Sequence, residues 1–220
     1  MPGGWTMSMV WMGMGGSWLG SAAEFMGMWA VMMLAMMLPS LATMLMRYRS
    51  VVREQRAGNI SALTATAAAG YFFVWAVAGM LVYPIGLSTS AAVMRWPALT
   101  YMVPRTIGLC LLIAGAIQLT PWKAEMLKRC RESCEAQRDT RVSAWKHGLR
   151  LGVDCSLCCV GFMTVLLVTG VMSLATMAVV AVGITLERVA RDPRWIARLA
   201  GAAMSMAGIL VIAGMKLAGI

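Results

Sequence analysis

Two groups of closely spaced cysteines carry the most distinctive chemistry in the sequence. The first, in LKRCRESCEAQ, is a C-x3-C pair, and the second, in VDCSLCCVGFM, is a C-x2-C-C group. The five residues are Cys130, Cys134, Cys155, Cys158 and Cys159. Helix residues four apart share a face, and a C-x-x-C spacing lets two thiolates reach one ion. The pattern predicts a metal site; inert buried cysteines are the alternative. Cys110 has no partner in sequence and is expected in the core.

Three neighbouring side chains could support such a site from a second layer. Met126 shares a helix face with Cys130, and Asp154 precedes Cys155, where it could cap a helix or accept a hydrogen bond. His147, the single histidine, could be a ligand or a proton carrier, although an interfacial position is the simpler interpretation. Four thiolates around one ion suggest zinc, whereas the excess of methionine favours Cu(I).

The first eighteen residues, MPGGWTMSMVWMGMGGSW, contain no charged side chain. Met7, Met9, Met12 and Met14 form two M-x-M pairs, and thioether sulfur suits soft Cu(I) better than Zn, Mg or Ca. The sequence therefore predicts an outer copper contact in this tail. The alternative is an apolar segment with methionine as filler and tryptophans at the membrane interface.

The segment MWAVMMLAMMLPS continues the methionine pattern within the first apolar run. At 100° per residue, Met28, Met32 and Met36 lie along one edge of a helix, and a second group, Met26, Met33, Met37 and Met44, clusters on another edge. The first stripe could line a metal path while the second packs against neighbouring helices. Packing alone is the alternative for both.

The elements that must position these residues are membrane-spanning helices. Hydrophobic residues make up 60% of the 220 and charged residues only 13%. Runs of about 18 or more apolar residues can cross a bilayer core as helices. The expected fold is an all-α helix bundle of about six spans in a lipid bilayer: Ser21–Met46, Ala62–Gly86, Tyr101–Thr120, Leu149–Thr169, Val171–Glu187 and Trp195–Leu217. The fourth and fifth should form a hairpin at Gly170, with one long broken helix as the alternative.

Basic residues orient the predicted bundle. Of 19 lysines and arginines, 16 fall in the loops that follow the first, third and fifth spans. Basic loops usually lie in the cytoplasm, so both termini are expected outside it. Residues 1–20 then form a periplasmic tail, residues 21–220 the membrane domain, and residues from about 121 to 150 a cytoplasmic loop that carries cysteines. The net charge of +10 is explained by topology and anionic headgroups, so nucleic acid is not an expected partner.

Three motifs resemble a bacterial family of predicted metal-binding integral membrane proteins. They are AMMLP (35–39), QLTPWK (118–123) followed by LKRCR, and HGLRLGVDCSLCC (147–159). The family has no firmly assigned activity and is sometimes labelled copper chaperone; the resemblance covers most of the chain and implies residence in the bacterial inner membrane. The chain departs from the family pattern at Met126, where a cysteine is usual, and at Leu157 and Val160 beside the double cysteine.

These observations favour a copper-handling membrane protein that binds Cu(I) through methionine and cysteine for storage, delivery or relay. The alternative is a small helical accessory subunit that helps to assemble a larger membrane complex, because runs such as TATAAAG and GAAMSMAG allow close helix contact. Thiol redox catalysis is a third possibility. The sequence has no P-loop and no phosphorylation-type aspartate loop, so we do not expect an enzyme.

Overall fold

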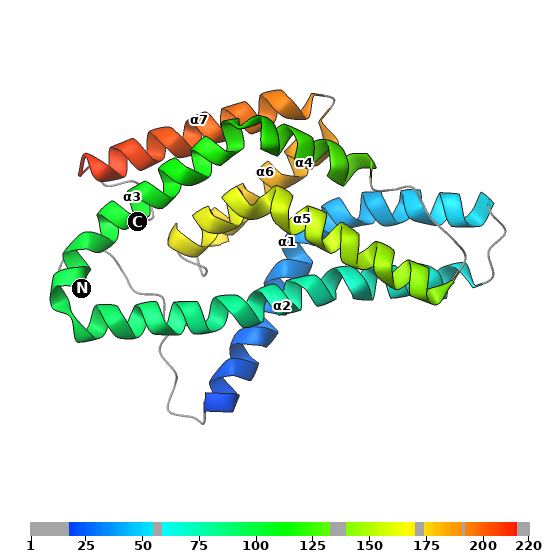
Figure 1. Ribbon diagram of the computed structural model, residues 1–220, viewed down its shortest axis with the longest axis horizontal. Helices are drawn as coiled ribbons and strands as arrows, with labels where there is room; N and C mark the ends of the chain where they lie inside the picture. The colour runs from blue at the N-terminus through cyan, green and yellow to red at the C-terminus, as the bar shows by residue number, and fades with distance from the viewer. Residues whose placement is uncertain (1–17, 55–58, 133–139, 170–173, 191, 215–220) are drawn as a thin grey trace.

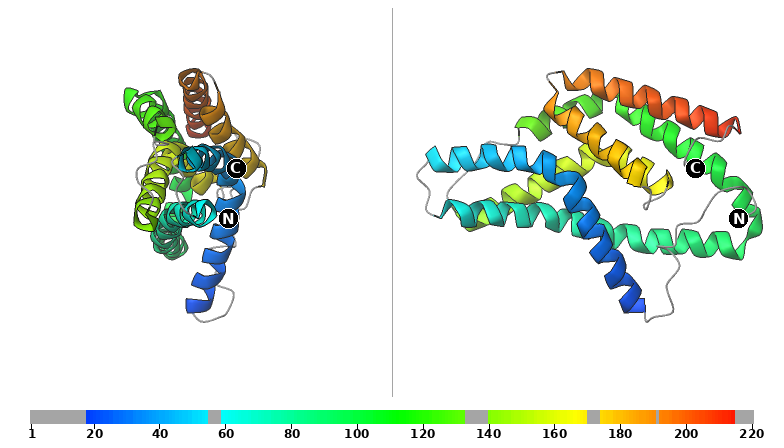
Figure 2. Two further views of the ribbon diagram at one scale, coloured as in Figure 1. Left: turned by 90° about the vertical axis from the view of Figure 1, so that its right-hand side faces the viewer. Right: turned by 180° about the vertical axis from the view of Figure 1, so that it is seen from behind.

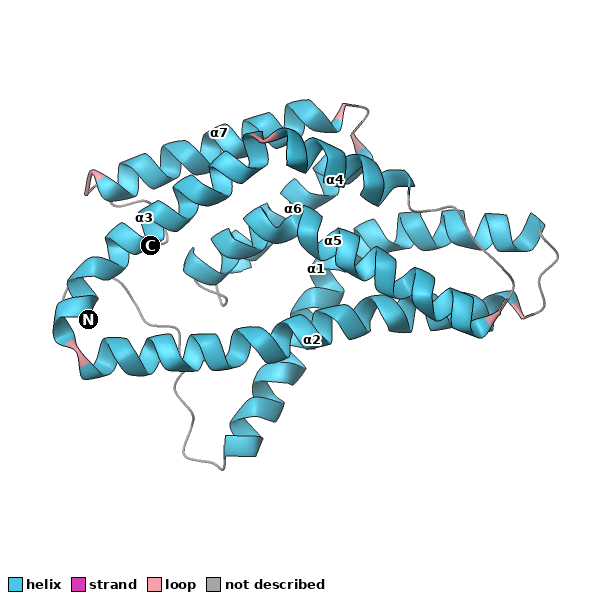
Figure 3. Cartoon of the chain, viewed as in Figure 1, coloured by secondary structure: helices cyan, strands magenta, loops and turns pink. Residues whose placement is uncertain are grey.

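The computed structural model describes residues 18–54, 59–132, 140–169, 174–190 and 192–214. Within these ranges the chain forms seven helices and no strand (Figure 3). The helices are α1 (Trp18–Glu54), α2 (Ile60–Arg95), α3 (Pro97–Leu119), α4 (Pro121–Glu132), α5 (Arg141–Thr169), α6 (Leu174–Val189) and α7 (Pro193–Ile212). The prediction of an all-α helix bundle is confirmed.

Five helical segments are long and apolar enough to cross a membrane. They are Trp18–Pro39, Ile60–Arg95, Tyr101–Leu119, Arg141–Thr169 and Pro193–Ile212. The fifth expected span corresponds to α6, which has 16 residues in the described part of the chain and is not among the five. At 1.5 Å per residue the described part of α6 is about 24 Å long, less than the roughly 30 Å of a hydrocarbon core. Within the described residues, five of the six expected spans are therefore long enough to cross a bilayer.

Several helices extend beyond the apolar runs that identified them. α1 continues to Glu54 and α2 to Arg95, because a helix satisfies its backbone hydrogen bonds in water as well as in lipid. α1 changes direction in its middle (Figures 1 and 2), and Pro39 lies inside it, where the missing N–H interrupts the hydrogen-bond ladder. The segment expected as a loop at 121–150 contains α4 and the start of α5.

Two helix pairs form the frame of the bundle. α3 lies beside α7 and α2 beside α5 (Figure 1), and glycines at both contacts let the backbones approach closely. α6 folds back along α5 and also contacts α1 and α7, so it lies between the two pairs. α4 follows α3 after the extended Thr120 and begins with a proline, which suits the first turn of a helix. This arrangement brings α4, α5 and α6 together.

A close backbone contact in the α2–α5 pair predicts a strong effect of substitution at Gly148. A Cβ added at Gly148 would stand 2.1 Å from the carbonyl oxygen of Ala67, which is backbone and cannot rotate away. Gly148→Ala is therefore expected to destabilise the bundle by about 1–3 kcal/mol, as overpacking of a tight interface does. Unfolding in detergent, followed by helical circular dichroism, measures the change.

Gly27 provides the matched control, because a Cβ there meets no atom within 4 Å. Gly27→Ala is expected to be neutral or slightly stabilising, since alanine has the higher helix propensity. Equal stability of the two variants would contradict the close α2–α5 contact.

Candidate metal site

Four cysteines from two helices meet in the interior of the bundle. α5 buries Cys155, Cys158 and Cys159 at positions i, i+3 and i+4, which share one helix face. α4 buries Cys130 on the same face as Lys123, Met126 and Leu127, which lie on one stripe of that helix. Side-chain hydrogen bonds link the thiols in the order Cys130, Cys158, Cys159, Cys155. Cys134 lies outside the described residues, and half-buried Cys110 lies on α3.

Two methionines of α1 extend this group of sulfur atoms. The Cys155 thiol points to Met37 Sδ, 4.0 Å away. Met44 Sδ is 3.8 Å from the guanidinium of Arg188, which also contacts the thiols. We refer to the four cysteines with Met37 and Met44 as the sulfur cluster. Tyr71 of α2 closes one side, with its hydroxyl 3.0 Å from Cys155 Sγ.

The two methionine stripes of α1 were expected to face different directions, but both face the core. Met32 and Met36 are buried, as are Met33 and Met37, and Met28 packs against the same core. Both stripes therefore face the interior, while the opposite side of α1 exposes Val31, Leu34 and Leu38. Met37 and Met44 reach the sulfur cluster, and both belong to the stripe that was not assigned to a path. Met7, Met9, Met12 and Met14 lie outside the described residues.

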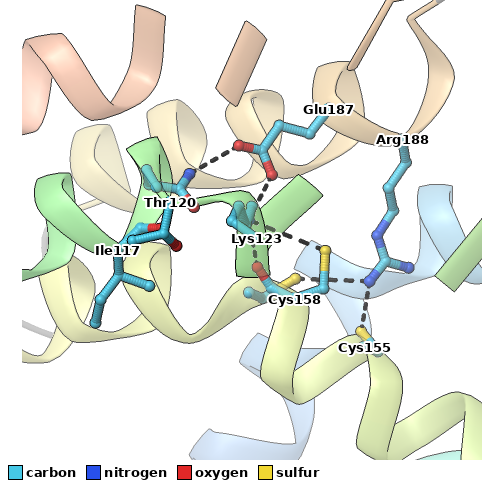
Figure 4. A network of polar contacts seen from close by, with 9 residues as sticks. Ile117, Thr120, Lys123, Cys155, Cys158, Glu187 and Arg188 are labelled. Atoms are coloured by element: carbon cyan, nitrogen blue, oxygen red, sulfur yellow. Dashed lines mark hydrogen bonds and ion pairs between the residues drawn. The ribbon is translucent and has the colours of Figure 1, made fainter. Parts of the chain in front are cut away.

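A buried arginine stands among the thiols. Arg188, near the end of α6, is 7% exposed, and one guanidinium nitrogen lies 2.8 Å from Cys155 Sγ and 3.6 Å from Cys159 Sγ (Figure 4). Guanidinium hydrogen bonds favour the thiolate form of cysteine. The protein thus supplies its own cation beside the sulfurs.

A buried ion pair adjoins the same cluster. Lys123 Nζ donates to the carbonyl oxygen of Cys158 and lies 2.8 Å from Glu187 Oε2, with both side chains 2% exposed or less. Gln118 Nε2 donates to the other oxygen of Glu187 at 2.7 Å. Figure 4 shows that Glu187 and Arg188, neighbours on α6, reach toward α4 and α5. Glu187, the last residue of the fifth expected span, is therefore buried inside the bundle.

The expected second-layer residues occupy three different places. Met126 is buried on the cluster side of α4. His147 stacks on Tyr48 with ring centroids 4.9 Å apart, and its Nε2 is buried without a hydrogen-bond partner. Asp154 is half-buried on α5 next to Cys155, and its effect on the cluster is electrostatic repulsion of a Cys130 thiolate. The structure therefore brings only Met126 to the face that carries Cys130.

The thiols form a series along α4 and α5 rather than a cage around one point. Among the described residues, no group of three or more His, Cys, Asp or Glu side chains could hold a metal ion. The hydrogen bond with Cys158, assisted by the positive charge of Arg188, lowers the pKa of Cys130. A tetrahedral zinc site, the alternative suggested by the cysteine spacing, has no support in this geometry.

Sequence reasoning missed Lys123 and Arg188 because it counted them as loop charges, and it missed Glu187 because it ended the fifth span there. A signal was present in the periodicity. α6 buries Val180, Ile184, Glu187 and Arg188, so its apolar stripe continues directly into two charged residues. In α4 the lysine likewise begins the buried stripe that ends at Cys130. Charged residues at core positions of apolar helices indicate a functional site.

Comparison with known proteins agrees with the motif resemblance. The chain has no significant match among curated proteins or among solved structures. A family model for PpoB2, described as copper chaperone, matches residues 26–211. The matched range contains the whole sulfur cluster and leaves out the methionines of the tail. The chain belongs to the PpoB2 family, whose description is copper chaperone.

Proposed function

We propose that this chain is an integral membrane protein that binds Cu(I) at the sulfur cluster and holds it for delivery or relay. The family description supports a role in copper handling. The five long apolar helical segments support a location in a bilayer, where charged side chains are retained mainly when they serve a function.

The observation that carries the proposal is the convergence of six sulfur atoms in one buried place. Cysteine and methionine sulfurs are soft ligands and select Cu(I) over the harder divalent ions. Two ligands that each lie about 2.3 Å from a three-coordinate ion are about 4.0 Å apart. The separation of Cys155 Sγ and Met37 Sδ is 4.0 Å, so these two atoms are already spaced as ligands of one ion.

The composition of the cluster disfavours zinc. A structural zinc site takes four N or S ligands in a tetrahedron, whereas thioethers bind Zn²⁺ poorly. Thiols linked in a series, with Met37 beside the last of them, suit an ion that accepts fewer ligands. Cu(I) is therefore the ion that best fits this set of donors.

Metal analysis of the purified protein tests the proposal. Reduced protein loaded with Cu(I) in detergent and freed of excess metal is expected to retain about one copper per chain. Protein offered zinc in the same way is expected to retain far less. Copper content no higher than that of an unrelated membrane protein would contradict the proposal.

The contribution of the thioether is tested by Met37→Leu. Leucine matches methionine in size and apolarity but has no sulfur, so the fold is expected to persist while Cu(I) affinity falls at least about tenfold. Met28→Leu is the control, because Met28 only packs against the core. Competition with a Cu(I) chelator measures both affinities.

A further inference from the structure

The guanidinium of Arg188 occupies space that a metal ion bound to Cys155 and Cys159 would need. A single nitrogen contacts both sulfurs, at 2.8 and 3.6 Å, and the other terminal nitrogen lies 3.8 Å from Met44 Sδ. The guanidinium thus stands between cysteines of α5 and a methionine of α1, and Figure 4 shows it pointing from α6 to Cys155. Any ion in the sulfur cluster must bind beside this charge.

From this contact we propose that Arg188 is a specificity-determining residue that makes the sulfur cluster select a monovalent soft ion over divalent ions. The inference rests on the proposed function, since it assigns an arginine a role in Cu(I) binding. It adds a physical reason for the preference for Cu(I) over zinc that the proposed function assigns to the sulfur cluster.

The electrostatic argument follows from the distances. An ion about 2.3 Å from Cys155 Sγ lies no more than about 5 Å from the Arg188 nitrogen that contacts the same sulfur. Coulomb repulsion is proportional to the charge of the ion, so the guanidinium opposes a divalent ion twice as strongly as a monovalent one. The site is buried, so water and salt screen this difference weakly.

The steric argument points in the same direction. Arg188 contacts Cys155 and Cys159, and Lys123 Nζ lies 4.0 Å from Cys158 Sγ. Protein cations therefore stand beside three of the four thiols, which hinders assembly of four thiolates around one ion. An ion satisfied by few sulfurs can still bind on the side of Met37.

The sulfurs and Arg188 also depend on each other in the metal-free protein. Thiolates held together without a cation repel one another, and a guanidinium relieves that repulsion through charge-assisted hydrogen bonds. A lysine would keep the charge as a single point, without the planar fork that reaches several sulfurs. The charge and the shape of the side chain can therefore be tested separately.

The experiment offers Cu(I) and Zn²⁺ together, at equal free concentrations, to reduced full-length protein in detergent and measures both metals per chain. Arg188→Met and Arg188→Gln both remove the charge, and both are expected to shift the ratio of bound zinc to bound copper at least about tenfold toward zinc. Arg188→Lys is expected to keep the selectivity close to that of the wild type. Arg198→Met, at an exposed arginine of α7, is the control and is expected to change nothing.

Helical circular dichroism and elution as a single species show which variants are folded. The glutamine variant retains hydrogen bonding to sulfur, so it remains informative if the methionine variant does not fold. Wild-type selectivity in a folded neutral variant would overturn the role of Arg188 and leave the proposed function intact. A wild-type protein that binds no copper would overturn both.

Discussion

Replacing Cys155 and Cys158 together by serine is expected to abolish copper retention while the helix bundle survives. Serine oxygen is a hard ligand and does not replace thiolate at Cu(I). The double substitution removes a thiol at each helix contact of the cluster. Cys155 contacts Met37 of α1, and Cys158 contacts Cys130 of α4. Copper per chain is expected to fall more than tenfold, to the level of an unloaded sample.

The control for this double substitution is Cys110→Ser, which changes a half-buried cysteine on α3. That variant is expected to retain copper as the wild type does, with the same helical circular dichroism. Wild-type copper content in the double variant would show that the metal binds elsewhere, with the methionine tail as the first place to look.

Removing the negative partner of the buried ion pair is expected to have the largest effect on stability. Glu187→Gln leaves the Lys123 ammonium buried without its counter-charge, and breaking a buried pair in this way costs about 3–5 kcal/mol. Lys123→Met combined with Glu187→Met removes both charges and is expected to cost much less. Unfolding by a denaturing detergent, monitored by circular dichroism, measures the difference between the two variants.

The exposed pair Glu125–Arg129 on α4 supplies the matched control. Its side chains are 53% and 60% exposed, and the atoms are 3.4 Å apart. Exposed pairs one helical turn apart contribute about 0.3–0.5 kcal/mol, so Glu125→Gln is expected to change stability very little. A small effect at Glu187, equal to that at Glu125, would show that Lys123 does not depend on this carboxylate.

The long apolar helices could be predicted from sequence because apolar runs leave few alternatives in a bilayer, whereas α4 lies in a segment expected as a loop. The positions of Cys155, Cys158 and Cys159 on one face of α5 also follow from helical periodicity alone. The contact between Gln118 and Glu187 does not, because it joins residues 69 positions apart on α3 and α6. Such contacts depend on how whole helices pack, and a run of hydrophobic residues fixes neither the partner nor the crossing angle.

The same limit explains the error at the end of α6. A charged residue after an apolar run is usually a loop residue, and the positive-inside rule depends on that regularity. Arg188 breaks the regularity because the end of α6 lies between two helix pairs, where the sulfurs of α5 can stabilise its charge. Neither the net charge nor the number of basic residues in loops indicates that cysteine sulfurs can stabilise a buried arginine.

The depth of the sulfur cluster has a kinetic consequence for an ion held there. Cys155 is 0% exposed and the other three cysteines are 2% exposed or less. Transfer between thiolates proceeds by contact of the incoming sulfur with the ion before the old bond is lost, and an acceptor in water cannot make that contact. The residence time of the ion is then set by how often the helices separate rather than by the strength of its bonds.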